Sequence, residues 1–597
     1  MTDVLGGPAT GIDPITFEVL ANAFSAVVDD MGVMIEKVSF STVTTIGKDY
    51  ACVLADPTGD VFARGAGGLP LITGTAAPRI KAVLTHIDPA DIDDGDVFLF
   101  SDPFMGGTHG QDVSAVMPVF DDGRLLAFVM SASHWPDTGG AVPGSFNSEA
   151  TSTHGESLLI TPIHIMREGR WDREVERLIL RNVRIPEVIQ GDLRGMIEAC
   201  RTGRDQLLKL VDKYGRELIE RQMVALLEHS ERLLRQHVAA VPDGRYAFTD
   251  LIDRDPGSDS REPIEVGLDI TIAGDRITLD FSRSGPEAIG PVNAPGSATR
   301  AAATSALKEV FHEVPWNQGF ERVLEWVLPE GLVVNASYPR PVSGVAASPA
   351  EKVISLVHGC LIQAVPERCM ACPTNLVNVS VHGVDARPGH GNEYVLYIWM
   401  AGGWGARPGR RDAHTSLFPL GPGTNLQPAE SLERIYPVRF DAFELKPDSE
   451  GAGYHRGGFA LQCPFRIVGA DATVNVQGDR QRHHGWGAEG GDPPQGSNIV
   501  YAPGTADERE LEIMSARNPV TADTPLDYWQ AGGGGWRSPL TRPPEWVLDD
   551  VRDGLVSVAR AREVYGVAVV VGGDGATLSH DAAETGRLRT AVRARAD

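Results

Sequence analysis

The chain has few cysteines, an excess of acidic over basic residues and no long apolar run, and each absence excludes a class of protein. Its six cysteines are scattered over 597 residues, which excludes a disulfide framework of the kind found in small secreted domains. No apolar run approaches the roughly 20 residues that a membrane-spanning helix needs. Residues 1–14 have neither the basic nor the apolar segment of a signal peptide. We therefore expect a cytoplasmic protein with reduced thiols and no contact with a membrane.

Basic residues are in the minority, with 54 lysines and arginines against 80 acidic residues and a net charge of −26. This balance argues against nucleic acid and anionic membranes as partners. The phosphate-binding loop Gly-x-x-x-x-Gly-Lys-Ser/Thr is missing, because Asp49 follows Gly47 and Lys48. No Gly-x-Gly-x-x-Gly phrase joins a strand to a helix. We therefore predict no nucleotide-binding residues here, and any nucleotide in the reaction should bind to another chain.

Two short phrases contain more candidate metal ligands than any other stretch. Residues 106–112 read Gly-Gly-Thr-His-Gly-Gln-Asp, and residues 133–140 read Ser-His-Trp-Pro-Asp-Thr-Gly-Gly. Each phrase places a histidine three residues before an aspartate. The candidates are His109, Asp112, His134 and Asp137. Imidazole and carboxylate are ligands of catalytic Zn²⁺, Mn²⁺ and Fe²⁺ sites, which keep one position open for water. The alternative is that both phrases are polar turns in unrelated loops.

The apolar runs beside these phrases predict a small antiparallel sheet. Residues 96–100 read as a buried strand that leads into the first phrase, and residues 125–130 as one that leads into the second. Residues 113–120 form the segment between them and turn at residues 121–123. Separate ligands can meet at the ends of neighbouring strands, so this sheet would bring the two phrases together.

The rest of the chain mixes helical and strand-forming segments, which predicts a mixed α/β (α+β) fold with several domains. Apolar residues have helical spacing over residues 14–38 and 186–240. Strand patterns cover residues 264–281, 375–399 and 465–476, the last as a strand pair. The predicted parts are an N-terminal metal-site domain (1–185), a helical segment (186–243), a central α/β domain (244–440), a C-terminal β-rich domain with a terminal helix pair (441–567) and a polar tail (568–597).

Eight phrases follow one another in the order found in one known family. They begin at Gly47, Asp102, Ser133, Gly290, Gly402, Tyr454, Gly532 and Val547, and read GKDYAC, DPFMGGTH, SHWPDTGG, GPVNAP, GGWGAR, YHRGG, GGGGW and VLDDVRDGLVS. From about Asp13 to about Val567 the chain resembles the hydantoinase B / 5-oxoprolinase B-subunit family. The phrases are specific for the family and much less specific for a substrate.

The resemblance implies a large hydantoinase B-like subunit in a hetero-oligomer with a hydantoinase A-type ATPase subunit, which binds the ATP. It also implies one divalent metal in this chain, with Zn²⁺ expected first and Mn²⁺ or Fe²⁺ as alternatives. The family's metal ligands fall on Asp49, His109, Asp112 and His134. Asp49 enters through the resemblance alone, because an aspartate at a strand start is otherwise an ordinary cap or turn residue.

The activity that the resemblance implies is hydrolysis of a small cyclic amide (a hydantoin, oxoproline or a lactam) after its phosphorylation on the partner. The metal would supply hydroxide, because coordination lowers the pKa of water from about 16 to about 7. Two catalytic residues are predicted: Asp137 as a base or as support for a ligand, and Glu156, which matches a family glutamate. For Asp137 the alternative is a turn cap. Alternative functions are a subunit of an ATP-dependent ketone carboxylase and a non-catalytic scaffold for the ATPase.

The chain departs from the family pattern at Trp135, where a histidine is common, and in the phrase at residues 348–352. If Trp135 walls the metal pocket, the pocket should favour substrates with an apolar body. If Trp135 points away from its neighbour His134, as adjacent strand residues do, it belongs to the core. The histidines whose roles stay open are His154, His414, His483 and His484.

Overall fold

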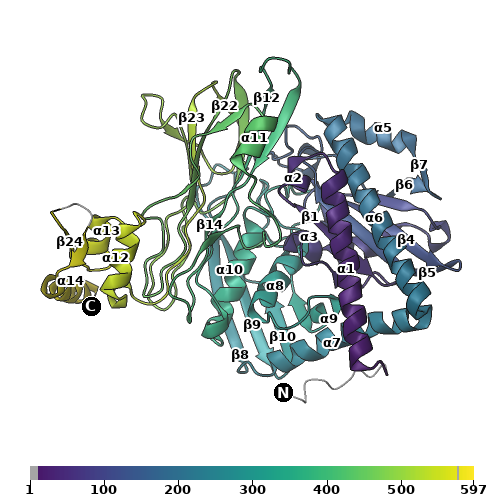
Figure 1. The fold of residues 1–597 in the computed structure, drawn as a ribbon, viewed down its shortest axis with the longest axis horizontal. Coiled ribbons are helices and arrows are strands. Elements are labelled where there is room, and N and C mark those ends of the chain that lie inside the picture. The colour runs from purple at the N-terminus through teal and green to yellow at the C-terminus, as the bar shows by residue number, and fades with distance from the viewer. Residues whose placement is uncertain (1–10, 574–576, 597) are drawn as a thin grey trace.

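The computed structural model describes residues 11–573 and 577–596. Figure 1 shows a broad body of helices and sheets, a β-rich part that rises above one end of it, and a small helical module that stands to one side near the C-terminus. The predicted mixed α/β fold with several parts is confirmed. Among the helices of the described residues, none has both the length and the apolar composition needed to span a bilayer.

The N-terminal part is built on one antiparallel seven-stranded sheet with the strand order β2-β1-β5-β4-β3-β6-β7. Its strands are β1 (Tyr50–Ala55), β2 (Val61–Arg64), β3 (Val97–Phe100), β4 (Asp112–Asp121), β5 (Arg124–His134), β6 (Ile163–Arg167) and β7 (Arg170–Trp171). The sheet predicted around the two phrases is confirmed as β3, β4 and β5, which form the centre of this larger sheet.

Long helices cover one face of the seven-stranded sheet. α1 (Pro14–Val38), capped by the Asp13 carboxylate, lies along α6 (Pro186–Tyr214), as Figure 1 shows. Val113 and Ala115 of β4 pack with both helices in one buried cluster, because alternate residues of a strand point to the same face. The remaining helices of this region are α2 (Thr42–Thr45), α5 (Arg173–Arg181) and α7 (Arg216–Val238).

The opposite face of the sheet packs on the central part of the chain, where Phe128 and Met130 of β5 share a second buried cluster with the central helices. The central sheet has the order β11-β10-β9-β8, and its only parallel pair in the described residues is β10 and β11. Its elements are β8 (Gly244–Ile252), β9 (Ile264–Ala273), β10 (Arg276–Asp280) and β11 (Leu324–Val327), with α3 (Pro70–Gly74), α4 (Ala76–His86), α8 (Gly296–Val310), α9 (Gln318–Glu321) and α10 (Pro349–Leu361) around them.

The β-rich part consists of two sheets packed on one apolar cluster. The first contains β12 (Asn378–Val384), β13 (Glu393–Ile398), β19 (Ala472–Gln477) and β22 (Ser515–Val520). The second contains β16 (Val438–Phe440), β17 (Glu444–Leu445), β18 (Leu461–Ile467), β20 (Asn498–Tyr501), β21 (Arg509–Glu510) and β23 (Pro525–Trp529). Short elements nearby are β14 (Gly402–Gly403), β15 (Thr415–Ser416) and α11 (Ala429–Ile435).

One strand prediction in this part is wrong. Residues 465–476 were expected to form a strand pair, and their strands exist as β18 and β19, but the two belong to different sheets. Phe465 of β18 and Val474 of β19 still share the apolar cluster between the sheets. The same alternation of apolar residues therefore suits a crossing between two packed sheets as well as a hairpin.

The C-terminal module contains the predicted helix pair as α12 (Pro544–Arg552) and α13 (Val558–Glu563). Residues 568–597 were expected to be a polar tail, but their described part forms β24 (Val569–Val571), β25 (Leu578–His580) and α14 (Ala582–Ala596). Val569 of β24 packs at the edge of a small apolar cluster to which α12 and α13 contribute, which composition alone did not indicate. The predicted domain boundaries stay a prediction.

Candidate metal centre

The structure brings three of the predicted ligands together at the end of the β4–β5 hairpin. Asp112 begins β4, His134 ends β5, and His109 lies in the loop just before β4. The Asp112 carboxylate lies 3.1 Å from Nε2 of His109 and 3.2 Å from Nδ1 of His134. One ligand atom from each residue lies within 4.8 Å of the others, and all three side chains are buried. These three residues form a group that could hold a metal ion.

Asp49 reaches the same place from the neighbouring strand. It directly precedes β1, which pairs with β5, and its carbonyl accepts a hydrogen bond of 3.0 Å from the backbone N–H of His134. The Asp49 side chain is 8% exposed and lines the same small cavity as the other three residues. Burial, reinforced by the negative charge of Asp112 and offset in part by His134 and His109, raises the pKa of Asp49 to about 6.

Two orphaned polar atoms make this group suitable for a cation. Oδ1 of Asp49 and Nε2 of His134 are both buried and have no hydrogen-bond partner. Buried polar atoms are nearly always paired, so two unpaired acceptors beside one another call for a bound positive group. Two carboxylates and two imidazoles are a donor set that Zn²⁺, Mn²⁺ and Fe²⁺ accept. The residues present therefore fit a divalent ion.

A buried arginine holds the ligand loop in shape. Arg79 of α4 is fully buried, and its Nη1 donates to the carbonyl oxygen of Asp112 at 2.8 Å and to the hydroxyl of Ser114 at 2.6 Å. Its Nη2 donates to the hydroxyl of Thr108 at 2.9 Å, and that hydroxyl donates to the Asp112 carboxylate. Such contacts behind the ligands fix their direction and tune their affinity for a metal.

Hydrogen bonds also set the protonation of the ligands. Nδ1 of His109 lies 2.7 Å from the amide oxygen of Gln111, which can only accept, so Nδ1 carries a proton and Nε2, which faces the Asp112 carboxylate at 3.1 Å, is the nitrogen that a metal would bind. Burial would raise the pKa of Asp112, but the charges and hydrogen bonds of His109 and His134 hold it well below its ordinary range. The group therefore presents an ionised carboxylate beside an imidazole nitrogen that a metal ion could bind in place of a proton.

The cavity beside the ligands is small and has mostly apolar walls. The volume open to the centre of a water molecule is about 20 Å³, which suits about one water-sized occupant. Its other walls are Leu69, Leu71, Ala346, Leu376, Asn378, Tyr397, Trp399, Phe418, Leu420 and Thr424. The Tyr397 ring stacks on the His134 ring with centroids 5.1 Å apart, and its hydroxyl donates to Oδ1 of Asn378 at 2.6 Å.

The two predicted catalytic residues do not line this cavity in the structure. The Asp137 carboxylate accepts backbone hydrogen bonds from Gly139 and Gly144 and pairs with Arg184 at 3.0 Å. The Glu156 carboxylate accepts the backbone N–H groups of Val342 and Ser343, at 2.8 Å each. Burial raises the pKa of Glu156 to about 7. The catalytic roles of Asp137 and Glu156 stay predictions.

Trp135 does not line the metal cavity, so the prediction that it forms a wall of the metal pocket is wrong. Its side chain is 1% exposed and packs in the cluster with α1 and α6, on the face of the sheet opposite to His134. Neighbouring residues at a strand end point to opposite faces, which is the physical reason. The position of Trp135 therefore gives no reason to expect a substrate with an apolar body.

The four histidines with open roles lie outside the metal group. Nδ1 of His483 lies 3.3 Å from the Asp253 carboxylate, and His154 contacts the Tyr338 hydroxyl at 2.9 Å. The ring of His414 stacks on Trp404. Sequence reasoning missed two contributors to the centre, Arg79 and Tyr397. The only signal for Arg79 is a lone arginine on an otherwise apolar face of a helix, and Tyr397 is one of several aromatic residues in its strand.

The fold and the site together define a large mixed α/β protein with a buried histidine and carboxylate centre at the end of a β-hairpin. The profile described as Hydantoinase B/oxoprolinase matches residues 13–539, so the chain belongs to the hydantoinase B/oxoprolinase family. This confirms the family that the eight phrases indicated.

Four matches describe what the chain is similar to. The caprolactamase subunit beta of Pseudomonas jessenii is 30% identical over 96% of this chain and 99% of its own length. The acetophenone carboxylase delta subunit of Aromatoleum aromaticum is 25% identical over 98% of this chain and 90% of its own length. The crystal structure of the ATP-dependent caprolactamase from Pseudomonas jessenii matches with a TM-score of 0.86 at 28% identity and covers 97% of this chain and all of the other. An acetone carboxylase structure has the same fold, with a TM-score of 0.91 at 21% identity, over 99% of this chain and 84% of the other.

Proposed function

We propose that this chain is the metal-bearing B-type subunit of an ATP-dependent hydrolase of cyclic amides. The observation that carries the proposal is the cluster of His109, Asp112 and His134, with Asp49 beside it, in one buried cavity. Because all four candidate ligands are present in this chain, a non-catalytic scaffold for the ATPase is disfavoured. The similarity to a caprolactamase subunit over nearly the whole of both chains supports a lactam or a related ring amide as the substrate class.

The proposed ligands are His109 through Nε2, His134, Asp112 and Asp49, and Zn²⁺ is the first candidate ion, followed by Mn²⁺ and Fe²⁺. A divalent ion at this position would lower the pKa of water and polarise a carbonyl or phosphoryl oxygen.

The residues of this chain prepare the site for that chemistry. Arg79 and Thr108 hold the Asp112 carboxylate, and the Tyr397 ring holds the plane of His134. The aliphatic and aromatic walls exclude bulk water, which strengthens every charge interaction inside. We propose that Asp137 positions the loop after His134 through its bonds to Gly139 and Gly144, in place of acting as a base.

Glu156 is proposed to tie the metal-bearing part to the central part of the chain, because its carboxylate binds the amides of Val342 and Ser343. Its pKa of about 7 would also let it take up and release a proton near neutral pH, should substrate reach it. A Glu156→Gln variant separates the two roles. Loss of the inflection near pH 7 in the pH profile of kcat/KM would support proton transfer by Glu156. An unchanged profile with lower stability would support the structural role.

The proposed partner is an A-type ATPase subunit that activates the amide by phosphorylating its oxygen. An unstrained amide is a poor electrophile, and phosphorylation converts its oxygen into a good leaving group. The relatives named above are subunits, and the caprolactamase structure is described as ATP-dependent, which supports a hetero-oligomer here as well.

A ketone carboxylase subunit is the second candidate, supported by the similarity to the acetophenone carboxylase delta subunit. The experiment uses this chain with its co-purified ATPase partner, and it measures the loss of lactams and of ketones with ATP, with and without bicarbonate. Ring opening that needs ATP and no bicarbonate supports the hydrolase. Turnover of a ketone that depends on bicarbonate would replace it with the carboxylase.

A further inference from the structure

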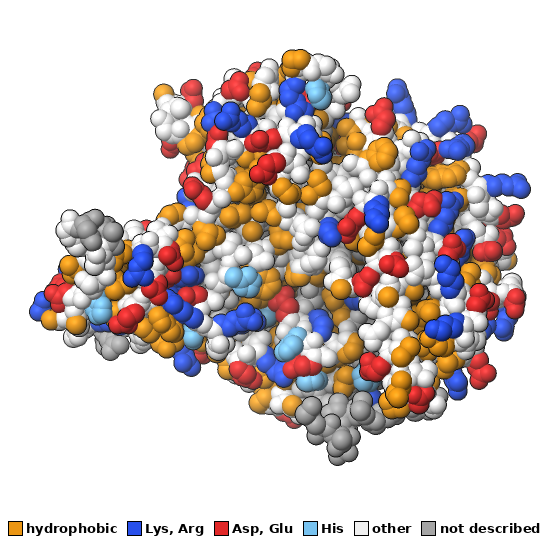
Figure 2. Space-filling view, viewed as in Figure 1, with side chains coloured by type: hydrophobic (Ala, Val, Ile, Leu, Met, Phe, Trp, Pro, Cys, Tyr) orange, Lys and Arg blue, Asp and Glu red, His pale blue; other side chains and the backbone are white. Residues whose placement is uncertain are grey.

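A second cavity lies over α8 and α10 and shares no lining residue with the metal cavity. Its volume of about 500 Å³ is in the range of small-molecule sites. The deep part is formed by His358, Cys369 and Met370, none more than 4% exposed. Arg407 and Arg410 stand exposed at its rim. On the face drawn in Figure 2, basic and histidine side chains gather over the α8 and α10 region.

The two rim arginines have no hydrogen-bonded or ion-paired partner of their own among the described residues. In the described part of the chain, neither the Arg407 nor the Arg410 guanidinium has a hydrogen bond or an ion pair, although the protein has a net charge of −26. Burial and then the like charge of Arg410 lower the pKa of Arg407, while Glu309, which lines the cavity together with Glu367, acts in the opposite direction. Two cations held together over a cavity favour an anion that binds both, and guanidinium groups match the two oxygens of carboxylate or phosphate.

His358 adds an unpartnered polar atom to the deep wall of the cavity. Its Nε2 lies 3.0 Å from the carboxylate of Glu309, while its Nδ1 is buried without a hydrogen-bond partner. Because a carboxylate can only accept, Nε2 donates to Glu309, and Nδ1 is left for another partner. The side chain is 2% exposed, so an occupant of the cavity is a natural partner for Nδ1.

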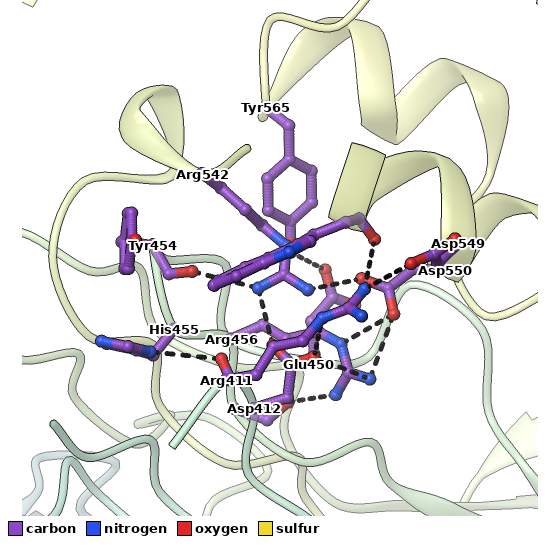
Figure 3. A network of polar contacts seen from close by, with 12 residues as sticks. Arg411, Asp412, Glu450, Tyr454, His455, Arg456, Arg542, Asp549, Asp550 and Tyr565 are labelled. Carbon is purple, nitrogen blue, oxygen red and sulfur yellow. Dashed lines mark hydrogen bonds and ion pairs between the residues drawn. The ribbon is translucent and has the colours of Figure 1, made fainter. Parts of the chain in front are cut away.

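The loop that presents the two arginines is fixed at its base. Figure 3 shows the polar network that joins this loop to the C-terminal module. Arg411 donates to Asp549 of α12 at 2.8 Å, and the Asp412 carboxylate accepts from Arg542 at 2.6 Å. Arg542 in turn donates to Asp550 at 2.9 Å. The loop with the rim arginines is therefore anchored by a network of ion pairs around the buried Arg542, which limits the entropy that binding would cost.

We propose that this cavity binds a small molecule with a carboxylate or phosphate group, gripped by Arg407 and Arg410 and contacted by Nδ1 of His358. The side chains of Cys369 and Met370 offer an apolar surface to the rest of the ligand. The site is independent of the metal centre and does not rest on the proposed hydrolase activity.

The test is calorimetric titration of the full chain with inorganic phosphate and, separately, with acetate. We expect saturable binding of at least one of them at one site per chain. Binding of phosphate alone or of acetate alone identifies which group the natural ligand carries. R407Q/R410Q should bind at least about tenfold more weakly, because it removes both charged donors. R434Q/R439Q removes two exposed arginines outside the cavity and should bind as the wild type does.

Two further measurements distinguish failure of this proposal from failure of the metal site and from misfolding of the double variant. H109A should bind the anion normally even if it loses all activity, so a failed metal site leaves the inference standing. If R407Q/R410Q does not fold, hydrogen exchange of the wild-type chain decides, because the bound anion should slow exchange in residues 402–412. No saturable binding of either anion, equal binding by R407Q/R410Q, or unchanged exchange would overturn the proposal.

Discussion

Asp112 and His134 lie directly opposite each other as Cα partners on the antiparallel strands β4 and β5. Their meeting therefore follows from the register of one hairpin, whose turn lies at Asp122 and Gly123. A slip by one residue would turn one of the two side chains to the opposite face of the sheet, toward α1 and α6. The length of this hairpin is what places an imidazole against a carboxylate.

Arg79 is expected to control metal affinity without touching the metal. R79M keeps much of the side-chain volume but removes the donors to Asp112, Ser114 and Thr108. Loss of such support lowers metal affinity by about 10- to 100-fold, measured by competition with a chromophoric chelator. R480M is the matched control, because Arg480 is equally buried but pairs with Asp250 away from the centre. Equal metal affinity in wild type, R79M and R480M would show that Arg79 serves stability alone.

Trp135 is expected to matter for stability and not for substrate choice. W135F leaves a gap in the cluster with α1 and α6 and should lower the free energy of unfolding by about 1–3 kcal/mol, as core substitutions do. The metal content and the ratio of kcat/KM between lactam and hydantoin substrates should not change. A shift of that ratio at wild-type stability would return Trp135 to the substrate pocket.

Asp192 of α6 predicts a measurable dependence of stability on pH. Its Oδ1 accepts the N–H groups of Phe40 and Ser41, and burial raises its pKa from 3.8 to about 6. The folded state therefore holds this proton more tightly than the unfolded state does. The protonated Asp192 carboxyl therefore contributes up to about 3 kcal/mol to the free energy of unfolding below pH 3.8, and this contribution is lost as the pH rises through about 6.

D192N keeps the accepting oxygen but cannot ionise, so it escapes this loss. Its stability relative to wild type should grow by about 1 kcal/mol between about pH 5 and about pH 7.5, measured by urea unfolding. D212N, an exposed site on the same helix, should show no such trend. A constant difference between D192N and wild type across this range would contradict the raised pKa.

The chain alone is expected to leave ATP intact, because its sequence lacks a phosphate-binding loop and the proposed ATPase is the partner. Phosphate release should appear only when the A-type subunit is added, and the ring amide should stimulate it. ATP hydrolysis by the purified single chain, stimulated by substrate, would contradict this division of labour.

Local sequence patterns predicted the hairpin and the meeting of His109, Asp112 and His134 because both are encoded within about 25 residues, from His109 to His134. The helix at residues 14–38 was predictable for the same reason, with its cap and apolar face in one segment. Arg79 and Tyr397 were not, because their contacts with the centre join residues that are far apart in the sequence.

The separation of β18 and β19 into two sheets was also not predictable, because alternating apolar residues do not specify which strand will be the hydrogen-bonded neighbour. Predicting which face of the sheet Trp135 points to required the register of β5. Asp49 entered through the family resemblance, and only its burial beside the other candidate ligands and its unpaired oxygen give a physical reason to include it.

The most direct test of the metal centre is elemental analysis of the purified chain and of H109A, D112A and H134A, with H483A and H484A as histidine controls. We expect about one divalent ion per chain in the wild type and in both controls, and a loss of nearly all metal in the three ligand variants with the fold retained by circular dichroism. D49A should retain a weakened site, because three ligands remain. Full metal occupancy in H109A and H134A, or metal loss in H483A instead, would contradict the account.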